Sequence, residues 1–318
     1  MSIASVRAQH SEWVSALDGD GPWLTVPALT QVLDAGLIPS TTEQNQTLRR
    51  AWTTYSTAAS NRTSEAQQAW IRSVVTDLLG WGDYADFTHA DRWVHTDPVH
   101  EITITPGFAL LPRLADDDSV VPVLLGFIYP PGTPLTKRVG DGWATTPTDR
   151  AAHALRAADV PLGVVTDGRW WTLLWAPRSK DGAAATSGYA LWSTDLLLDD
   201  ELLRSAFTTL LSQHRSLAVA DAKTLRGLFE KSGESQEDIT ENLSVQTRKA
   251  VELLVDAFST ANHRVGGAYL DGVDADHVYQ GAVTIVMRII FTLAAEERRL
   301  LPGDDDFYTK TYGIAGLA

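Results

Sequence analysis

The sequence contains no cysteine and only six lysines, and basic residues are outnumbered by acidic ones. Without cysteine the chain can form no disulfide, no thiolate metal site and no cysteine nucleophile. Lysine and arginine together number 26 against 40 aspartates and glutamates, so the formal net charge is −14. This balance argues against a protein that coats nucleic acid through bulk positive charge, but it is compatible with a local basic groove.

A hydrophobic run that resembles a signal peptide is also missing near the amino terminus, where residues 1–7 are followed at once by polar sequence. We therefore expect a cytoplasmic protein. The chain has 318 residues, 44 % of them hydrophobic, which suits one large or two modest domains with real cores.

Hydrophobic patterning divides the chain into a helical N-terminal arm over residues 1–62, an α/β core over residues 63–194 and a helical connector over residues 195–318. In the arm and at the start of the core, apolar residues recur at three- and four-residue spacings. The expected fold class is α/β (α+β), with a mixed sheet in the core and helices before and after it.

Several strand signals lie in the core. Residues 101–105 alternate strictly, and residues 120–129 form an uninterrupted apolar run, as a strand buried on both faces would have. Residues 150–158 predict a short helix. Two apolar runs on either side of Asp167 and Gly168 are the strongest hairpin signal in the sequence.

The connector ends in an unusually apolar helix. Its acidic stretch, residues 230–242, reads as an exposed linker between helices. In residues 282–295 the only polar side chains are Thr284, Arg288 and Thr292, so we expect this helix to lie deep in protein, with Arg288 paired to an acid. We expect no membrane span, because the apolar run is short and Arg288 sits in its middle.

A metal site has limited support. His89, His95 and His100 fall close together with Asp91 and Asp97, but no two of the histidines have the i, i+4 spacing of ligands on one helix face. We favour the interpretation that they are solvated loop residues.

Motifs for other chemistries are missing as well. The sequence has no Gly-x-Ser-x-Gly elbow and no phosphate-cradling glycine loop. Methyl transfer to a base amine needs an Asn/Asp-Pro-Pro-aromatic loop, and the sole Pro-Pro, at residues 130–131, has the wrong neighbours.

A metal-dependent nuclease of the PD-(D/E)XK type needs an acid on one strand and, on the adjacent strand, an acid two residues before a lysine. The carboxylates hold Mg²⁺ and the lysine helps to activate water. The sole acid-x-Lys runs from Asp221 to Lys223, inside a predicted helix, and residues 120–129 carry no charged side chain. The catalytic residues of this class are therefore missing.

Three motifs nevertheless occur in a familiar order. Leu-Leu-Gly-Trp-Gly closes a helix at residues 78–82, the predicted hairpin spans residues 160–174, and Ile-Ile-Phe-Thr-Leu-Ala-Ala-Glu-Glu-Arg-Arg-Leu-Leu-Pro at residues 289–302 precedes Tyr308 and Tyr312. This order resembles the N-terminal region of large adenine-specific DNA methyltransferases of the type IIG restriction–modification kind and of their relatives in phage-defence systems such as BREX and DISARM. The resemblance covers roughly residues 70–318.

The resemblance implies a PD-(D/E)XK-like domain with a GxxTNGxxW hairpin, then a connector of the form LLFLLYAEDRGLLP before a methyltransferase domain. Asp167 stands where the family often has Asn, a small change for a type I′ turn, and Arg299 replaces a glycine. The chain stops about where the methyltransferase domain would begin, so we expect a fragment of a longer protein. The full-length family implies S-adenosylmethionine as cofactor, DNA as substrate and companion defence subunits as possible partners.

These observations lead to one expected function and two alternatives. We expect a non-catalytic N-terminal module, with no cofactor of its own, that serves DNA or partner-subunit binding. An active endonuclease would need Mg²⁺ and unusual ligands, for which Asp97, Glu101, Asp116 and Asp118 are the candidates, although we favour reading them as turn formers. A stand-alone acidic interaction protein is the third possibility.

The hairpin turn supplies the candidate DNA contacts. Arg169 and Trp170 follow the turn directly, where an arginine can contact a DNA backbone and a tryptophan can stack on a base. The alternative is structural, with one ring of the Trp170–Trp171 pair packed inward and the other against a neighbouring helix.

Overall fold

The computed structural model describes residues 2–57, 64–112, 120–179, 181–297, 300–301, 308, 311 and 313. By compactness the chain forms two units, Met1–Gln236 and Glu237–Ala318, which we describe separately. The three-segment division expected from the sequence stays a prediction.

The first unit is built on a mixed seven-stranded sheet with the order β1-β9-β8-β7-β6-β5-β2. Strands β6 and β7 are parallel and all other neighbours are antiparallel. The strands are β1 (Asp18–Asp20), β2 (Ala85–Asp86), β5 (Phe108–Leu110), β6 (Leu124–Ile128), β7 (Leu162–Thr166), β8 (Trp170–Trp175) and β9 (Gly188–Ser193). The predicted mixed α/β fold is confirmed.

Helix α5 (Pro147–Ala157) makes the crossover that the parallel pair β6–β7 requires. Its start is encoded locally, because Thr146 and Asp149 form a capping box and Pro147 occupies the first turn. This helix confirms the one predicted over residues 150–158, with a start three residues earlier.

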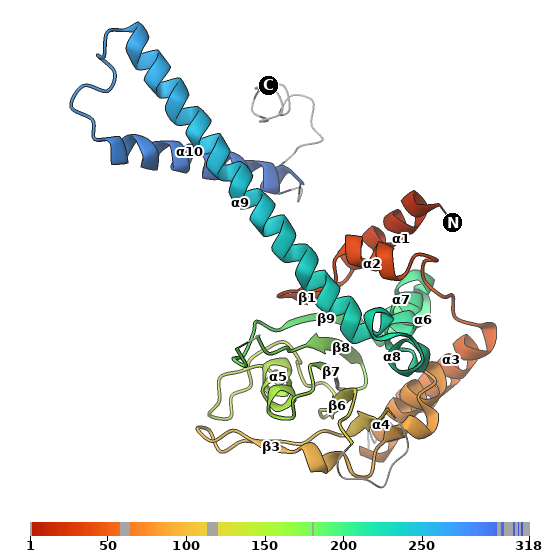
Figure 1. The fold of residues 1–318 in the computed structure, drawn as a ribbon. Coiled ribbons are helices and arrows are strands. Elements are labelled where there is room, and N and C mark those ends of the chain that lie inside the picture. The colour runs from red at the N-terminus through yellow and green to blue at the C-terminus, as the bar shows by residue number, and fades with distance from the viewer. Residues whose placement is uncertain are drawn as a thin grey trace. The chain divides into compact units, whose positions relative to one another are not determined.

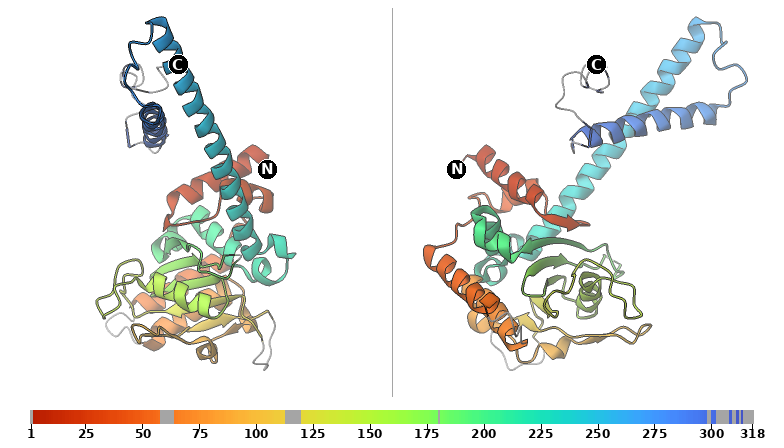
Figure 2. Two further views of the ribbon diagram at one scale, coloured as in Figure 1. Left: turned by 60° about the vertical axis from the view of Figure 1, so that its left-hand side comes forward. Right: turned by 180° about the vertical axis from the view of Figure 1, so that it is seen from behind.

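Helices cover both faces of the sheet (Figures 1 and 2). Alternate residues of the strands point to opposite faces, so Leu125, Phe127 and Val165 pack with α5, while Leu124 and Val164 pack on the other side. Burial on both faces explains the uninterrupted apolar run of residues 120–129, which contains β6. The second face is covered by α1 (Ile3–Ala16), α2 (Val26–Val32), α3 (Thr42–Thr57), α4 (Ser64–Ser73), the π-helix η2 (Val74–Leu78), α6 (Thr194–Asp199), α7 (Glu201–Leu211) and the start of α9 (Leu225–Arg264).

Smaller elements complete the unit. They are α8 (Gln213–Leu217), the 3₁₀ helices η3 (Gly82–Tyr84), η4 (Ala90–Trp93) and η5 (Asp221–Lys223), and a separate two-stranded sheet of β3 (His95–Thr96) and β4 (Thr103–Ile104). The alternating stretch over residues 101–105 therefore contributes only two strand residues, and they lie outside the main sheet.

The predicted hairpin at Asp167 is confirmed, but its turn is not a two-residue type I′ turn. Thr166 pairs with Trp171, so four residues, 167–170, separate the paired positions. The Thr166 hydroxyl accepts a hydrogen bond from Gly168 N–H (2.9 Å), and Gly168 has φ of 86°. Side-chain hydrogen bonds therefore shape the longer loop.

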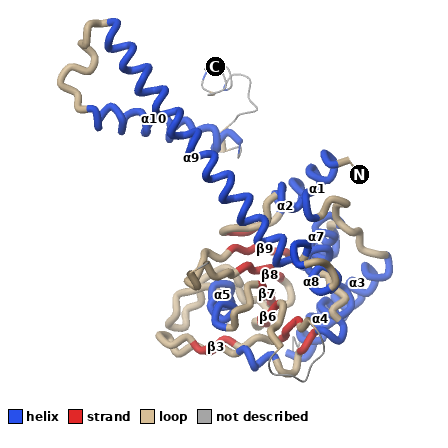
Figure 3. Tube along the Cα trace, in the orientation of Figure 1, coloured by secondary structure: helices blue, strands red, loops and turns tan. Residues whose placement is uncertain are grey.

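Helix α9 corrects the linker prediction. Residues 230–242 lie inside this 40-residue helix, which Figure 3 draws as continuous. Glutamate, glutamine and lysine are good helix formers, and a single glycine such as Gly233 is too weak a breaker to end the helix.

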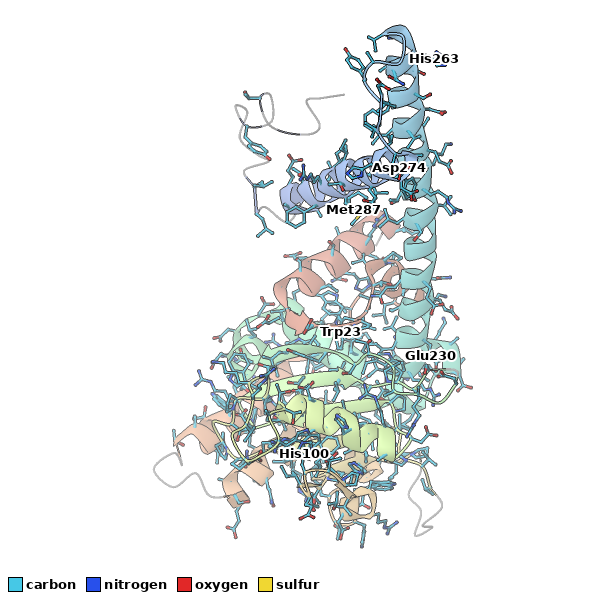
Figure 4. All side chains as sticks on the ribbon, turned by 90° about the vertical axis from the view of Figure 1, so that its left-hand side faces the viewer. Trp23, His100, Glu230, His263, Asp274 and Met287 are labelled. Carbon is cyan, nitrogen blue, oxygen red and sulfur yellow. The ribbon has the colours of Figure 1, made fainter. Side chains whose placement is uncertain are left out.

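In the second unit, the later part of α9 packs against α10 (Ala275–Glu297) through Val251, Ala282 and Val286. The prediction of a deeply buried helix is wrong for α10. Five of its large apolar side chains are exposed, with Phe291 at 74 %; they are Ile285, Met287 (labelled in Figure 4), Ile289, Phe291 and Leu293.

Arg288 is exposed too, and within the described residues it forms no ion pair, so its expected acidic partner is missing there. The stretch Ala275–Glu296 is, by length and composition alone, long and apolar enough to cross a membrane, with a mean hydropathy of 1.6 over its most apolar 18 residues. Its uninterrupted apolar part is shorter and has Arg288 in its middle, so the expectation of no membrane span stays a prediction.

Candidate functional site

The candidate site lies where β6 and β7 end. Because these strands are parallel, the loops that follow them meet at one edge of the sheet, a common place for binding sites in α/β folds. A pocket of about 400 Å³ opens there, between α4, the residues before β5 and the residues after β6.

Helix α4 holds both strand ends in place. Gln67 is buried, and its Nε2 donates hydrogen bonds to the carbonyl oxygens of Tyr129 (2.7 Å) and Asp167 (2.8 Å). One turn further, Trp70 Nε1 donates to the carbonyl oxygen of Gly168 (2.6 Å). The pocket and the hairpin turn are therefore parts of one rigid edge.

Asp167 fixes the hairpin turn from inside. Its buried carboxylate accepts hydrogen bonds from the backbone N–H groups of Arg169 (2.9 Å) and Trp170 (2.7 Å) through Oδ1, and from Gly132 (3.0 Å) through Oδ2. Three backbone donors satisfy this carboxylate without a cation. An aspartate at this position therefore has a structural role in binding the loop after β6 to the turn.

The pocket wall offers hydrogen-bond donors and one positive charge. Arg72 lies with its guanidinium 4.1 Å above the centre of the Phe87 ring and forms no ion pair within the described residues. Gln68 and Thr105 add an amide and a hydroxyl, and among the described residues no acid lines this pocket. Such a wall suits an anion with oxygen acceptors.

Tyr129 also lines the pocket. Burial raises the pKa of its phenol to about 12, so the hydroxyl stays neutral. Its oxygen lies 3.4 Å from the carbonyl oxygen of Pro147, to which it donates a long hydrogen bond.

Arg169 and Trp170, the predicted DNA contacts, sit on the hairpin turn at the same edge. Arg169 is exposed and pairs with Asp195 at 3.1 Å, an ion pair that is also exposed and therefore weak. Trp170 is 39 % exposed, whereas Trp171 is buried and its Nε1 donates to the Thr194 hydroxyl. Trp171 is the inward ring predicted for this pair, and packing of the other ring against a neighbouring helix stays a prediction.

The strand pair β5–β6 is closely packed at two glycines. Phe108 stands opposite Gly126, and a Cβ on Gly126 would lie 2.1 Å from the Phe108 ring. A Cβ on Gly107 would meet the Ile128 side chain at 2.8 Å. Aromatic and aliphatic side chains thus occupy the space beside both glycines, where a larger residue would not fit.

Of the four acids considered as unusual ligands, Asp97 and Glu101 lie in the loop between β3 and β4. Asp97 Oδ1 accepts hydrogen bonds from His100 N–H (2.8 Å), Val99 N–H (3.1 Å) and His100 Nδ1 (2.8 Å). The hydrogen bond from the His100 backbone is the main cause of a lowered pKa for Asp97. Glu101 is exposed in a left-handed conformation, with φ of 56°.

Both residues therefore act as turn formers. The other two candidates, Asp116 and Asp118, lie outside the described residues.

The histidines do not gather. His100, labelled in Figure 4, stacks on Trp143 with ring centres 5.0 Å apart, and His89 pairs with Asp86 at 3.4 Å. His95 lies in β3. In the part of the chain that the structure describes, no three His, Asp or Glu side chains are placed to hold a metal ion.

Sequence reasoning missed Gln67 and Arg72. Residues 67, 70, 71, 74, 75 and 78 form the buried stripe of this helical region, and Gln67 is its one polar member. A lone amide on an apolar stripe was the available signal, because a buried amide must find hydrogen-bond partners.

Comparison of the chain with protein-family models, with curated proteins and with solved structures finds no match in any of the three.

Proposed function

We propose that this chain is a non-catalytic DNA-binding module of a DNA adenine methyltransferase in a restriction–modification or phage-defence system. The observation that carries the proposal is the edge at the ends of β6 and β7. It presents Arg72 in an acid-free pocket, while the neighbouring strands β5 and β6 contain no acid and no lysine.

DNA binding at this edge would use backbone contacts. Arg72 would meet a phosphate, with the Gln68 amide and the Thr105 hydroxyl as further hydrogen-bond donors. Arg169 would contact a second phosphate after releasing Asp195, and the exposed ring of Trp170 would stack on a base or sugar.

With two arginines neutralising about two phosphates, the logarithm of the association constant should fall with log salt at a slope of about −2. A low slope is in keeping with the net charge of −14, because the rest of the surface adds no attraction.

Methyl transfer belongs, in this proposal, to another part of a longer protein, which would bind S-adenosylmethionine. Companion defence subunits would be partners of that longer protein. The Mg²⁺-dependent nuclease and the stand-alone interaction protein are the competing functions, and the experiments on DNA distinguish them.

The test is fluorescence anisotropy of a labelled DNA duplex titrated with the intact chain. Replacing both Arg72 and Arg169 by glutamine should weaken binding by about tenfold or more, since each removes a charged contact. The matched control is Arg50→Gln on α3, an exposed arginine away from the pocket wall, which should bind as the unchanged chain does. Equal binding by the double variant would contradict the proposed site.

A further inference from the structure

A second binding region lies at the opposite edge of the sheet, where β6 and β7 begin. Two adjoining pockets of about 550 Å³ and 210 Å³ meet there and share Asp159, Pro161, Arg226 and Glu230 in their walls. We call the pair the amino-edge groove. It is separate from the proposed DNA site, because none of its lining residues lines the pocket beside α4.

The smaller pocket collects three arginines from three elements. Arg156 comes from the last turn of α5, Arg178 follows β8, and Arg226 is in the first turn of α9. In a chain with net charge −14, this pocket is therefore a local concentration of positive charge.

Arg178 and Arg226 are held in place. Arg178 Nε donates to the carbonyl oxygen of Arg156 (3.1 Å) and its Nη1 donates to that of Gly182 (2.9 Å). Arg226 Nε donates to Glu230 Oε1 at 2.9 Å; Glu230 is labelled in Figure 4. Backbone carbonyl oxygens therefore orient Arg178, and an exposed ion pair orients Arg226 more weakly.

Arg156 is the member that lacks a full set of partners. Its Nη2 donates to the carbonyl oxygen of Ala185 (2.7 Å), but its buried Nε finds no hydrogen-bond partner within the described residues. Burial, and then the charge of Arg178, lower the pKa of this guanidinium. A buried donor without a partner and a cation beside another cation are both unfavourable, and one anion would relieve both.

The charges of the groove indicate how large that anion is. In the smaller pocket the three arginines are opposed by Asp159, 3.7 Å from Arg178, and by Glu230, which leaves one positive charge in excess there. Asp221 adds a negative charge to the larger pocket only, so the anion belongs in the smaller one. A singly charged group such as a carboxylate balances the excess, whereas a doubly charged phosphate would overcompensate.

The larger pocket indicates what carries the anion. Its wall includes Val121, which is 63 % exposed, together with Pro122, Val123, Leu162 and Leu225. An aliphatic group bound there would cover the Val121 side chain, which is now in contact with water, and would rest on a floor formed by the buried Leu162 and Leu225.

We propose that the amino-edge groove binds a carboxylate attached to an aliphatic body, with the carboxylate between Arg156 and Arg226 and the aliphatic part against Val121 and Leu225. The terminal carboxyl group of a peptide that ends in apolar residues and a free aliphatic acid share this chemistry.

The experiment is isothermal titration of the intact chain with acetyl-Val-Leu as the free acid, with the same dipeptide as its C-terminal amide, and with octanoate. The free acid should bind at least about tenfold more tightly than the amide, because only the acid forms charge-assisted hydrogen bonds. Octanoate binding without dipeptide binding would identify a free acid as the ligand, and the reverse would identify a peptide end. Binding of neither, or equal binding of acid and amide, would overturn the proposal.

Two variants change the charge of the groove in opposite directions and should change binding in opposite directions. Arg226→Gln removes the excess positive charge and should weaken binding of the acid by about tenfold, whereas Glu230→Gln adds to it and should strengthen binding. Both side chains are more than half exposed, so neither change should unfold the chain, and Arg50→Gln serves as the matched control. A Glu230→Gln variant that binds more weakly than the unchanged chain would contradict the charge argument.

Discussion

His10 has both ring nitrogens engaged inside the first unit. Trp13 Nε1 donates to its Nδ1 (3.0 Å), so the proton is on Nε2, which donates to the carbonyl oxygen of Leu33 (3.3 Å). The side chain is fully buried, and burial lowers its pKa below the ordinary value of 6.5. Protonation of His10 Nδ1 would place its N–H group against the N–H group of Trp13, and the hydrogen bond between them would be lost.

This arrangement predicts how stability depends on pH. The folded state holds its proton less tightly than the unfolded state does, so stability is fully present above about pH 6.5 and is lost as pH falls below that value. His10→Gln keeps a donor and an acceptor without a titrating proton, and should make the free energy of unfolding less sensitive to pH between 5 and 7. His153, whose pKa burial also lowers, leaves part of the slope in place. Urea unfolding across this range is the measurement, and an unchanged slope would contradict the assigned role of His10.

Removing the Gln67 amide should lower the stability of the fold. Gln67→Ala leaves the carbonyl oxygens of Tyr129 and Asp167 without their amide donor, which should cost about 1–3 kcal/mol in the free energy of unfolding. The neighbouring, exposed Gln68→Ala should change it by less than about 0.5 kcal/mol. Equal costs in urea unfolding would mean that Gln67 does not hold the edge together.

Among the strands, β5 and β6 pack closely because the Phe108 ring fills the space beside Gly126, which has no side chain. Gly126→Ala should destabilise the chain by about 1–3 kcal/mol, because the new methyl group meets the ring. Phe108→Ala removes the obstacle, so the double variant should be more stable than the sum of the single costs predicts, with a coupling of about 0.5–3 kcal/mol. Additive costs in a double-mutant cycle would show that the ring does not fill this space.

Helix α10 provides an internal comparison of its two faces. Val286 packs on α9 and is 6 % exposed, so Val286→Ala should lower the protection of α10 amides from hydrogen exchange. Phe291→Ala, on the exposed face, should leave that protection unchanged. A larger loss from Phe291→Ala would mean that this face is covered in solution.

The elements that the sequence predicted well are those set by local patterns. The helix α5 begins at a capping box, and the apolar runs around Asp167 form a hairpin. Strand β1 was missed because Asp-Gly-Asp has no strand propensity and becomes a strand only by pairing with β9. The burial of α10 was misjudged because its sequence gives only the apolar residues that could be buried. Whether another element packs on them depends on distant parts of the chain.

The candidate site was predicted only in part, for the same reason. Arg169 and Trp170 follow a turn that can be read from neighbouring residues. Arg72 joins them at the same edge because α4 packs across the ends of β6 and β7, a contact between residues about a hundred positions apart. Such a contact leaves no local pattern.

In the whole molecule, two edges of one sheet have different proposed roles. The ends of β6 and β7 present the donor-rich pocket proposed for DNA, and their beginnings present the amino-edge groove proposed for a carboxylate. Variants at one edge should leave binding at the other unchanged, so Arg226→Gln is expected to bind DNA with unaltered affinity. Loss of DNA binding in Arg226→Gln would mean that the two edges do not act separately.

The most direct test of the central claim follows both the binding and the integrity of one DNA molecule. A duplex with an end label is incubated with the intact chain and Mg²⁺ at low salt, and the bound fraction and the strand length are read from the same sample. We expect bound DNA that stays full length, with binding reduced in the Arg72→Gln, Arg169→Gln double variant. Cleavage that disappears in Asp97→Ala or Glu101→Ala would contradict the non-catalytic role, and unbound DNA would contradict the DNA-binding role.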